Sequence, residues 1–499
     1  MNEYKLIERF FLTIIEPTNI MLVVLGLLVG IFLGALPGIG SSMAIVLALP
    51  FTYFLDVLPA IAFLSTIYVG SAYGGSITAI LFNTPGTPEA VATTFDGHPM
   101  SQQGKSKKAL GLAISSSAFG GIFAVILMFS LASILSEVAF KIHASEYFAL
   151  AILGMTVISA LGTSNMVKAI ISGLIGIFIS TIGLDPLTAT DRFTFSTLEL
   201  MNGIDYIPIM IGAFALGEVF SQVTNNNPQN LNTSSKLSQG VFKFKDFFVY
   251  KWTAIKSATI GSLLGILPGT GGAIASFVSY GVAMKTDKNP EEFGKGKAEG
   301  VVAPETSNNA AAGVSMIPTL ILGIPGSPTT AVILAALVLQ GVQPGPQLMA
   351  DQPILLYSIF LAMLFASVMT LVAGRAGVQV FTLLLKAPYS IIATFIIILS
   401  LLGAYATNND LLNVWIMLLF GVVGYLMKIY HFSIASLILG IVLGPLMETS
   451  LRRQLLINNG EFLSLFHSPI TIILLVISVL IIVVPIIMDK KKAKSSNTN

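Results

Sequence analysis

Cysteine is absent from this chain of 499 residues, and charged residues make up only 10% of it. Without cysteine there is no disulfide, no thiol nucleophile and no thiolate metal site. The four histidines are scattered and no His-Glu-x-x-His motif occurs, so nothing indicates a zinc hydrolase. Lysine and arginine fall in short runs between apolar stretches, which argues against a nucleic-acid partner. We therefore expect neither a cofactor nor a bound nucleic acid.

Apolar residues dominate instead, at 54% of the chain with a mean hydropathy of +0.85. A soluble domain carries about 25% charged residues, so the composition predicts a polytopic protein of the lipid bilayer. No small-residue cleavage site precedes Gly34, and we expect residues 18–34 to be a retained first span. The basic run Lys490–Lys494 follows the last apolar stretch directly, which predicts a cytoplasmic C-terminus.

Apolar stretches of helical length recur along the whole chain and predict an all-α fold. A spanning helix needs about 20 apolar residues. Four stretches, 41–55, 272–284, 308–322 and 328–340, are too short to cross comfortably and adjoin Pro-Gly breaks, so we expect broken helices or re-entrant hairpins there. The other stretches are 18–34, 59–82, 108–138, 146–162, 166–184, 205–221, 251–267, 353–374, 388–404, 411–428, 431–447 and 469–487.

Two matching Gly-Pro breaks are the most informative feature. The segments Gly34–Gly40 and Gly265–Gly271 both follow the pattern Gly-x-Leu-Pro-Gly-x-Gly, and their first glycines lie 231 residues apart. Some fifty residues after each comes a second break, Asn83–Pro88 in one half and Gly323–Pro328 in the other. Paired interruptions at corresponding places in two halves of a membrane chain point to the binding site of a transporter.

The division of the chain follows from one polar linker at residues 222–250. We expect a first transmembrane repeat at 1–221, a second at 251–450, and a C-terminal span with a basic cytoplasmic tail at 451–499. Equivalent loops of the two repeats differ in charge: 105–108 and 285–297 are basic, whereas 56–59 and 341–352 have no lysine or arginine. Because basic loops face the cytoplasm, this pattern predicts two inverted repeats.

The second breaks each contain a sequence that is typical of a helix start. Thr87-Pro88 and Ser327-Pro328 each place a hydroxyl at a helix N-cap and proline at the first helical position. The free N–H groups at such a helix start attract an anionic group. The first breaks also place a helix start after a Pro-Gly pair, so four helix starts would surround one site. The competing interpretation is that glycine and proline only kink packed spans.

A polar cluster, Pro304–Ala310, precedes the short stretch at 308–322. Ser307 or Asn308 would suffice to cap a helix there, but five polar residues run together. Amide and hydroxyl oxygens suit a hard cation such as Na⁺, and amide N–H groups suit a carboxylate. We interpret Asp96–Pro99 as a polar turn, and the glycine-rich stretch Tyr68–Ser76 as either close helix packing or a cavity wall.

Two acidic residues lie within apolar segments. Glu89 falls in the first helical turn after Pro88, where it suits the helix dipole, and Glu218 lies near the end of its span. Acids inside membrane segments are functional candidates. The candidate residues for substrate binding are Ser41, Ser42, Thr87, Asn308, Asn309, Ser327 and Thr329; those for ion binding are Gly38, Asn83, Gly269, Thr270 and Ser307; those for proton or ion coupling are Glu89 and Glu218.

Several long motifs in order resemble the large membrane subunit of the tripartite tricarboxylate transporters, the TctA family. They are Gly34–Gly40, Tyr73–Gly86, Asp96–Met100, Phe293–Gly296, Pro304–Ala310, Leu322–Gly326 and Gly341–Pro346. The resemblance implies a secondary transporter of citrate or related carboxylates in the bacterial cytoplasmic membrane. It also implies a small membrane partner of the TctB type, an extracytoplasmic binding protein of the TctC type, and import driven by a cation gradient, usually Na⁺.

Three alternatives stay open. A passive organic-anion channel needs a continuous pore, commonly lined by rings of charge, and the sequence shows no repeated charge of that kind. An H⁺-coupled carboxylate carrier would use Glu89 or Glu218. An intramembrane hydrolase needs a nucleophile paired with a base, and no Ser-His or Asp-Asp arrangement recurs, so we do not expect an enzyme.

Overall fold

The computed structural model describes residues 16–36, 38–161, 166–224, 244–267, 271–384, 389–407 and 409–496. Within them the chain is built from helices, with one two-stranded antiparallel hairpin that pairs Gly183 with Arg192 and Leu184 with Asp191. The predicted all-α fold is confirmed. Gly269 and Thr270, two of the candidate ion ligands, lie outside the described residues, as does most of the predicted linker.

The elements up to residue 224 are α2 (Pro17–Ala35), α3 (Gly40–Ala48), η1 (Leu49–Phe54), α4 (Val57–Phe82), η2 (Pro88–Ala90), α5 (Val91–Gln102), α6 (Ser106–Phe140), α7 (Ala144–Leu161), α8 (Met166–Ser180), β1 (Gly183–Leu184), β2 (Asp191–Arg192), η3 (Leu198–Leu200), α9 (Tyr206–Met210), the π-helical η4 (Ile211–Leu216) and α10 (Gly217–Thr224).

The elements after residue 243 are η5 (Phe244–Tyr250), α11 (Lys251–Ile266), α12 (Gly271–Thr286), η6 (Pro290–Glu292), α13 (Glu299–Val314), the π-helical η7 (Pro318–Leu322), α14 (Pro328–Leu339), α15 (Pro346–Asp351), α16 (Pro353–Leu384), α17 (Tyr389–Ala406), α18 (Leu411–Ile429), α19 (Ile434–Ile457), η8 (Phe462–Phe466) and α20 (Pro469–Ser496).

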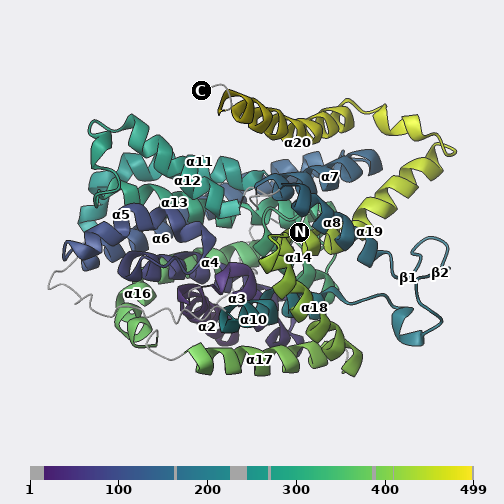
Figure 1. Ribbon diagram of the computed structural model, residues 1–499, viewed down its shortest axis with the longest axis horizontal. Coiled ribbons are helices and arrows are strands. Elements are labelled where there is room, and N and C mark those ends of the chain that lie inside the picture. The colour runs from purple at the N-terminus through teal and green to yellow at the C-terminus, as the bar shows by residue number, and fades with distance from the viewer. Residues whose placement is uncertain are drawn as a thin grey trace.

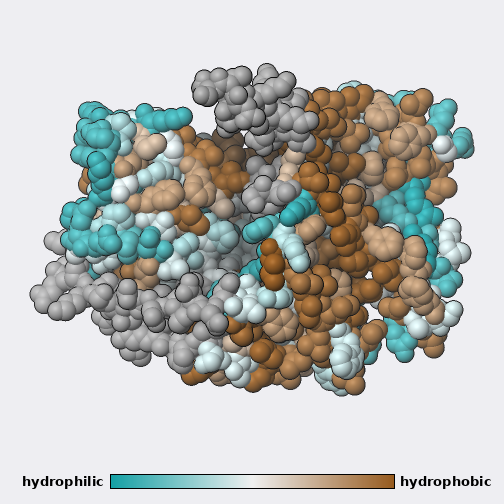
Figure 2. Space-filling view, viewed as in Figure 1, coloured by the Kyte–Doolittle hydropathy of each residue, from teal (hydrophilic) through white to brown (hydrophobic). Residues whose placement is uncertain are grey.

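Among the described residues, seven helices are long and apolar enough to cross a membrane: Pro17–Ala35, Val57–Phe82, Ser106–Val138, Tyr206–Thr224, Pro353–Gly374, Leu411–Ile429 and Ile434–Ile457. The helices α17 and α20 run along the horizontal direction of the view in Figure 1. In the same view, hydrophilic residues gather at the left and right edges and hydrophobic residues lie between them (Figure 2). This distribution fits a multi-pass membrane protein.

Both halves repeat one packing plan. In the first half, Gly30 and Gly34 of α2 lie against the carbonyl oxygens of Ile67 and Ser71 of α4. In the second half, Gly261 and Gly265 of α11 lie against the carbonyl oxygens of Ser307 and Ala311 of α13. A Cβ atom on any of these glycines would overlap the neighbouring backbone, so small residues let the helices approach closely.

The halves also exchange contacts. Helix α4 packs on α16 of the second half, while α13 packs on α6 of the first. In the same way α8 packs on α19, and α18 packs on the segment α9–η4–α10. Each contact has a counterpart with the halves swapped, which is what a repeat with approximate two-fold symmetry requires. Helix α20 adds to this plan by lying against α7 (Figure 1).

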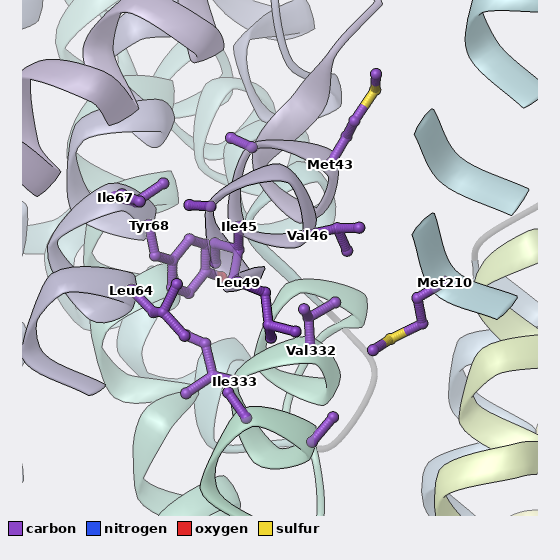
Figure 3. Packing of buried hydrophobic residues seen from close by; sticks show 14 of the residues in the cluster. Met43, Ile45, Val46, Leu49, Leu64, Ile67, Tyr68, Met210, Val332 and Ile333 are labelled. Atoms are coloured by element: carbon purple, nitrogen blue, oxygen red, sulfur yellow. The ribbon is translucent and has the colours of Figure 1, made fainter. Parts of the chain in front are cut away.

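The core lies where the broken helices meet the long ones. In Figure 3 the ring of Tyr68 from α4 is surrounded by apolar side chains of α3, α4 and α14, including Ile45 and Ile333, which are fully buried. Met210 reaches toward Val332 from the separate segment α9. The breaks are therefore embedded in packed structure.

Two sequence predictions about local structure are wrong. The helix expected to begin at residue 308 runs as α13 from Glu299 to Val314, so Ser307 and Asn308 lie inside it and cap nothing. The polar turn expected at Asp96–Pro99 is the interior of α5. Pro304 and Pro99 are both accommodated within helices.

Candidate functional site

Four helix starts, two from each half, meet in the fold. Helix α3 begins at Gly40, η2 at Pro88, α12 at Gly271 and α14 at Pro328. Within each half the starts are neighbours: a Cβ on Gly40 would lie 4.0 Å from Pro88, and one on Gly271 would lie 4.0 Å from Cβ of Ser327. We call this arrangement the helix-start ring.

Contacts between the halves close the ring. Ser42 Oγ lies 3.0 Å from Thr329 Oγ1, which joins the start of α3 to that of α14. Glu89 and Asn308 both lie against Gly272, with a Cβ at that glycine 2.9 Å from Cγ of Glu89, which joins η2 to α12 and α13. The predicted convergence of segments from both halves is therefore present in the structure.

Left-handed residues end the helices that precede the second breaks and turn the chain toward the helix-start ring. Helix α4 ends at Asn83 with a left-handed φ of 56°, and η7 ends at Gly323 with a φ of 71°. A left-handed residue is a common helix terminator, because it turns the chain away from the axis. Gly86 then packs against the carbonyl oxygen of Gly34, and Gly326 packs against Ser315.

The two second breaks differ in their capping. Ser327 accepts a hydrogen bond from the backbone N–H of Thr330 and forms a capping box with it, as predicted for this start. Thr87 accepts no capping hydrogen bond, and the helix after it begins with the 3₁₀ turn Pro88–Ala90 before α5 continues. The expected cap at Thr87 is therefore wrong, and the Thr87 hydroxyl is left for another partner.

Unpartnered polar atoms gather at the ring. Ser41 Oγ, Thr87 Oγ1, Glu89 Oε2 and both side-chain amide atoms of Asn308 are buried and have no hydrogen-bond partner within the described residues. Ser41 is 2% exposed, Thr87 is 1% exposed and Asn308 is 0% exposed. Each unmet hydrogen bond of this kind costs about 1–3 kcal/mol, so this concentration calls for an explanation by a bound group.

Tyr68 is a member of the site that we did not select from the sequence. Its hydroxyl lies 3.3 Å from Ser327 Oγ, across the boundary between the halves. By its place on α4, Tyr68 corresponds to Asn308 on α13, and Ser327 corresponds to Thr87. The tyrosine therefore reaches its hydroxyl partner, while the shorter asparagine leaves both itself and Thr87 unpartnered.

Other candidate residues have structural partners or lie elsewhere. Asn309 donates its amide to the carbonyl of Glu305, 2.9 Å away, and Ser307 donates its hydroxyl to the carbonyl of Ala275, 2.8 Å away. Asn83 is exposed at the end of α4. Gly38, with φ of 88°, lies beside the carboxylate of Glu218.

Glu218 differs from Glu89 because its charge is compensated. It forms an ion pair with Lys428 of α18, and its Oε1 accepts a hydrogen bond of 2.8 Å from the amide of Gln222. The sequence shows both charged residues but not their pairing, since 210 positions separate them. This pair lies next to the first Gly-Pro break, through Gly38.

A large cavity of about 1070 Å³ lies beside α14. Leu334 and Val338 of α14, Glu146 of α7 and Arg453 of α19 are among its lining residues. None of the ring residues lines it. We place the candidate site at the ring because the unpartnered polar atoms and helix starts are there, and we regard the cavity as a separate feature.

Comparison with known proteins agrees with the motifs. A family model described as the tripartite tricarboxylate transporter TctA family matches residues 20–439. An uncharacterized 52.8 kDa protein in the TAR-I ttuC′ 3′ region of Agrobacterium vitis is 36% identical over 477 residues, which cover 96% of this chain and 95% of that protein. An uncharacterized protein in the TAR-II ttuC′ 3′ region of the same organism is 39% identical over 234 residues, 46% of this chain and 97% of that protein. No solved structure matches the chain.

Proposed function

Because the chain belongs to the tripartite tricarboxylate transporter TctA family, we propose that it is the large transmembrane subunit of a secondary transporter that imports tricarboxylates or related carboxylates. The observation that carries this proposal is the helix-start ring with its unpartnered polar atoms. Helix N-termini present free N–H groups and a positive dipole end, so they hold carboxylates without a full positive charge. The Asn308 amide and the hydroxyls of Ser41 and Thr87 would supply directional hydrogen bonds.

A cation is the natural companion of such a substrate. Glu89 brings a carboxyl group into the same ring, and a substrate carboxylate beside it would be repelled unless a cation or a proton intervenes. We propose that import is driven by a cation gradient, with Na⁺ as the expected ion. Its oxygen ligands would be the side-chain amide oxygen of Asn308 and backbone carbonyl groups of the first breaks.

The partners follow from the family. We propose a small membrane subunit of the TctB type and an extracytoplasmic binding protein of the TctC type that delivers the substrate. The proposed location is the bacterial cytoplasmic membrane. Family membership and the seven candidate spans among the described residues support this assignment.

The test is uptake of labelled citrate, succinate or malate into proteoliposomes that hold this chain and its small membrane partner. The binding protein is added outside, with and without an inward Na⁺ gradient. Accumulation that requires both the gradient and the binding protein is the expected result. Equilibration without a gradient would indicate a channel or uniporter, and no flux of any carboxylate would refute the proposed substrate class.

A further inference from the structure

A second buried carboxyl group lies about one helical turn from the ring. Glu305 on α13 is 0% exposed. Its Oε1 accepts a hydrogen bond of 2.5 Å from Thr93 Oγ1 of α5, and its Oε2 accepts one of 3.0 Å from Ser117 Oγ of α6. These contacts join the second half of the chain to two helices of the first.

Glu305 accepts hydrogen bonds from hydroxyl groups, fewer than the four donors of Asp96, and among the described residues it lacks a counter-ion such as that of Glu218. Glu218 has Lys428 as its counter-ion, and Asp96 accepts three backbone N–H groups. Within the described residues no salt bridge includes Glu305. An ionised carboxylate buried in a membrane protein without a counter-ion costs several kcal/mol, so a bound cation or proton is needed to make this position stable.

The geometry argues against a metal cation between these oxygens, which leaves a proton as the group that neutralises Glu305. Oxygen ligands around a hard cation lie about 3 Å or more from one another, because each sits about 2.0–2.6 Å from the metal. The 2.5 Å separation between Thr93 Oγ1 and Glu305 Oε1 is shorter than that, so no hard cation bridges these two oxygens; the distance is that of a hydroxyl donating to a carboxylate. A hydroxyl group can donate to the ionised carboxylate and accept from the protonated one, so the pocket serves both states.

The surroundings contain few other titratable groups. Tyr73 of α4 faces Glu305, and Glu89 of η2 faces Asn308, three residues further along α13. Asp96 of α5 lies against Gly300 and accepts a hydrogen bond from the hydroxyl of Tyr280 on α12. Gly300 is five residues before Glu305 on α13, which is about 7.5 Å along the helix axis. The lysines of α6 and α11, Lys107, Lys108, Lys251 and Lys256, lie near the starts of those helices and are exposed or half-buried.

Within the described parts of the chain, only one of the two halves contains this polar pocket around Glu305. The position on α4 that corresponds to Glu305 is Ser65, and the position on α14 that corresponds to Thr93 is Ile333. The same helix packing therefore forms in the other half without a carboxyl group and without the threonine. Because the fold does not need this polar pocket, its presence in one half calls for a functional role.

We propose that Glu305, with Thr93 and Ser117, is a proton-binding site that makes H⁺ a second coupling ion of the carrier. Two helices connect the site to the helix-start ring. Helix α13 carries both Glu305 and Asn308, and α5, which carries Thr93, continues directly from the turn that holds Thr87 and Glu89. Loss of the proton leaves a bare charge between α5 and α13, so the proton and the substrate stabilise the same arrangement of these helices.

This inference rests on the proposed transport function, and the experiment separates the two. Proteoliposomes that hold the chain and its small partner, with the binding protein outside, are loaded with whichever of citrate, succinate or malate the wild type exchanges. Exchange at equal pH on both sides tests the carrier. Uptake driven by an inside-alkaline pH gradient, at equal Na⁺, tests the proton site. One pH unit can drive up to about tenfold accumulation for each proton carried.

Three variants give the readout. Glu305→Gln is expected to lose the stimulation by the pH gradient and to make exchange independent of pH. Glu305→Asp keeps a titratable group and is expected to retain a pH response with a shifted midpoint. Glu137→Gln, an exposed acid on the same helix as Ser117, is the matched control and should behave as the wild type.

Each outcome decides the question. Wild-type protein without any carboxylate exchange refutes the proposed function. Normal exchange with no response to the pH gradient, or a gradient response that survives in Glu305→Gln, refutes the proton site. Loss of Na⁺ stimulation in that variant, with the pH response intact, would assign the pocket to Na⁺ instead. If the glutamine variant fails to reach the membrane, an unshifted pH profile in Glu305→Asp refutes the proposal.

Discussion

Asp96 offers the sharpest test of how the two halves are held together. Its carboxylate lies on α5 of the first half and is 0% exposed. Oδ1 accepts the N–H groups of Gly296 at 2.8 Å and Lys297 at 2.7 Å. Oδ2 accepts the N–H group of Gly294 at 3.0 Å and the hydroxyl of Tyr280 at 2.8 Å. Every donor belongs to the second half, so this carboxylate ties α5 to the loop before α13.

The substitution Asp96→Asn keeps the size of the side chain and replaces one oxygen by an NH₂ group. Whichever oxygen is replaced, two of the four donors lose their acceptor and face another donor. A hydrogen bond to a charged group contributes about 1.5–3 kcal/mol, so the loss of two predicts a destabilisation of about 3–6 kcal/mol. We expect the melting temperature of the purified protein in detergent to fall by roughly 3–6 °C.

The control is Asp351→Asn, an exposed acid of α15, which should change the melting temperature by less than a degree. A double-mutant cycle with Tyr280→Phe sharpens the test, because the tyrosine hydroxyl is one of the four donors. The two changes should destabilise less together than the sum of their separate effects. Strict additivity, or a melting temperature for Asp96→Asn equal to that of the wild type, would refute the assignment of Asp96 as the tie between the halves.

Three further predictions concern the site and its supports. Asn308→Ala should abolish carboxylate uptake while surface expression and melting temperature stay near wild type, because the Asn308 amide has no partner within the described protein; retained uptake would remove Asn308 from the site. Gly86→Ala should lower the yield of folded protein, because the new Cβ would collide with the backbone of α2. The control Gly281→Ala, where a Cβ would meet no atom within 4 Å, should leave the yield unchanged. Equal yields for the two variants would contradict the close packing at Gly86. The hydrogen bond from Arg452 holds the pKa of Asp185 below its usual range. This carboxylate therefore stabilises the fold above about pH 4 and loses its effect as the pH falls through the lowered pKa. The difference in melting temperature between wild type and Asp185→Asn should shrink as the pH falls, and a constant difference would contradict the ion pair.

Composition and breaks predicted the helical architecture well, for a physical reason. In a bilayer every backbone group must find a partner within the protein, so long apolar stretches become helices and each interruption has a purpose. The paired breaks at Gly34–Gly40 and Gly265–Gly271 therefore pointed to the place where helix starts converge, and the contact of Ser42 with Thr329 confirms that the halves meet there.

Long-range pairing could not be predicted in this way. Local signals at Asp96–Pro99 favour a turn, yet the segment is helical and Asp96 finds its donors 184 or more positions away. The polar residues Pro304–Ala310 predict a helix start at 308, whereas α13 begins at Glu299 and runs through them, in close contact with α11 at Ala311. Tyr68 was part of a polar stretch in the sequence, but its hydroxyl contact with Ser327 exists only in the folded chain.

The duplicated architecture allows structure and function to be separated within one chain. Where the two halves carry the same residue at corresponding places, as with Gly30 and Gly261, the residue maintains a close helix contact needed twice. Where they differ at the centre, Asn308 stands opposite Tyr68 and Glu89 opposite Thr329. In a fully symmetric ring both halves would present the same groups. The differences around the ring give it one polar, unpartnered side, and that side is where we propose that the carboxylate substrate and its cation bind.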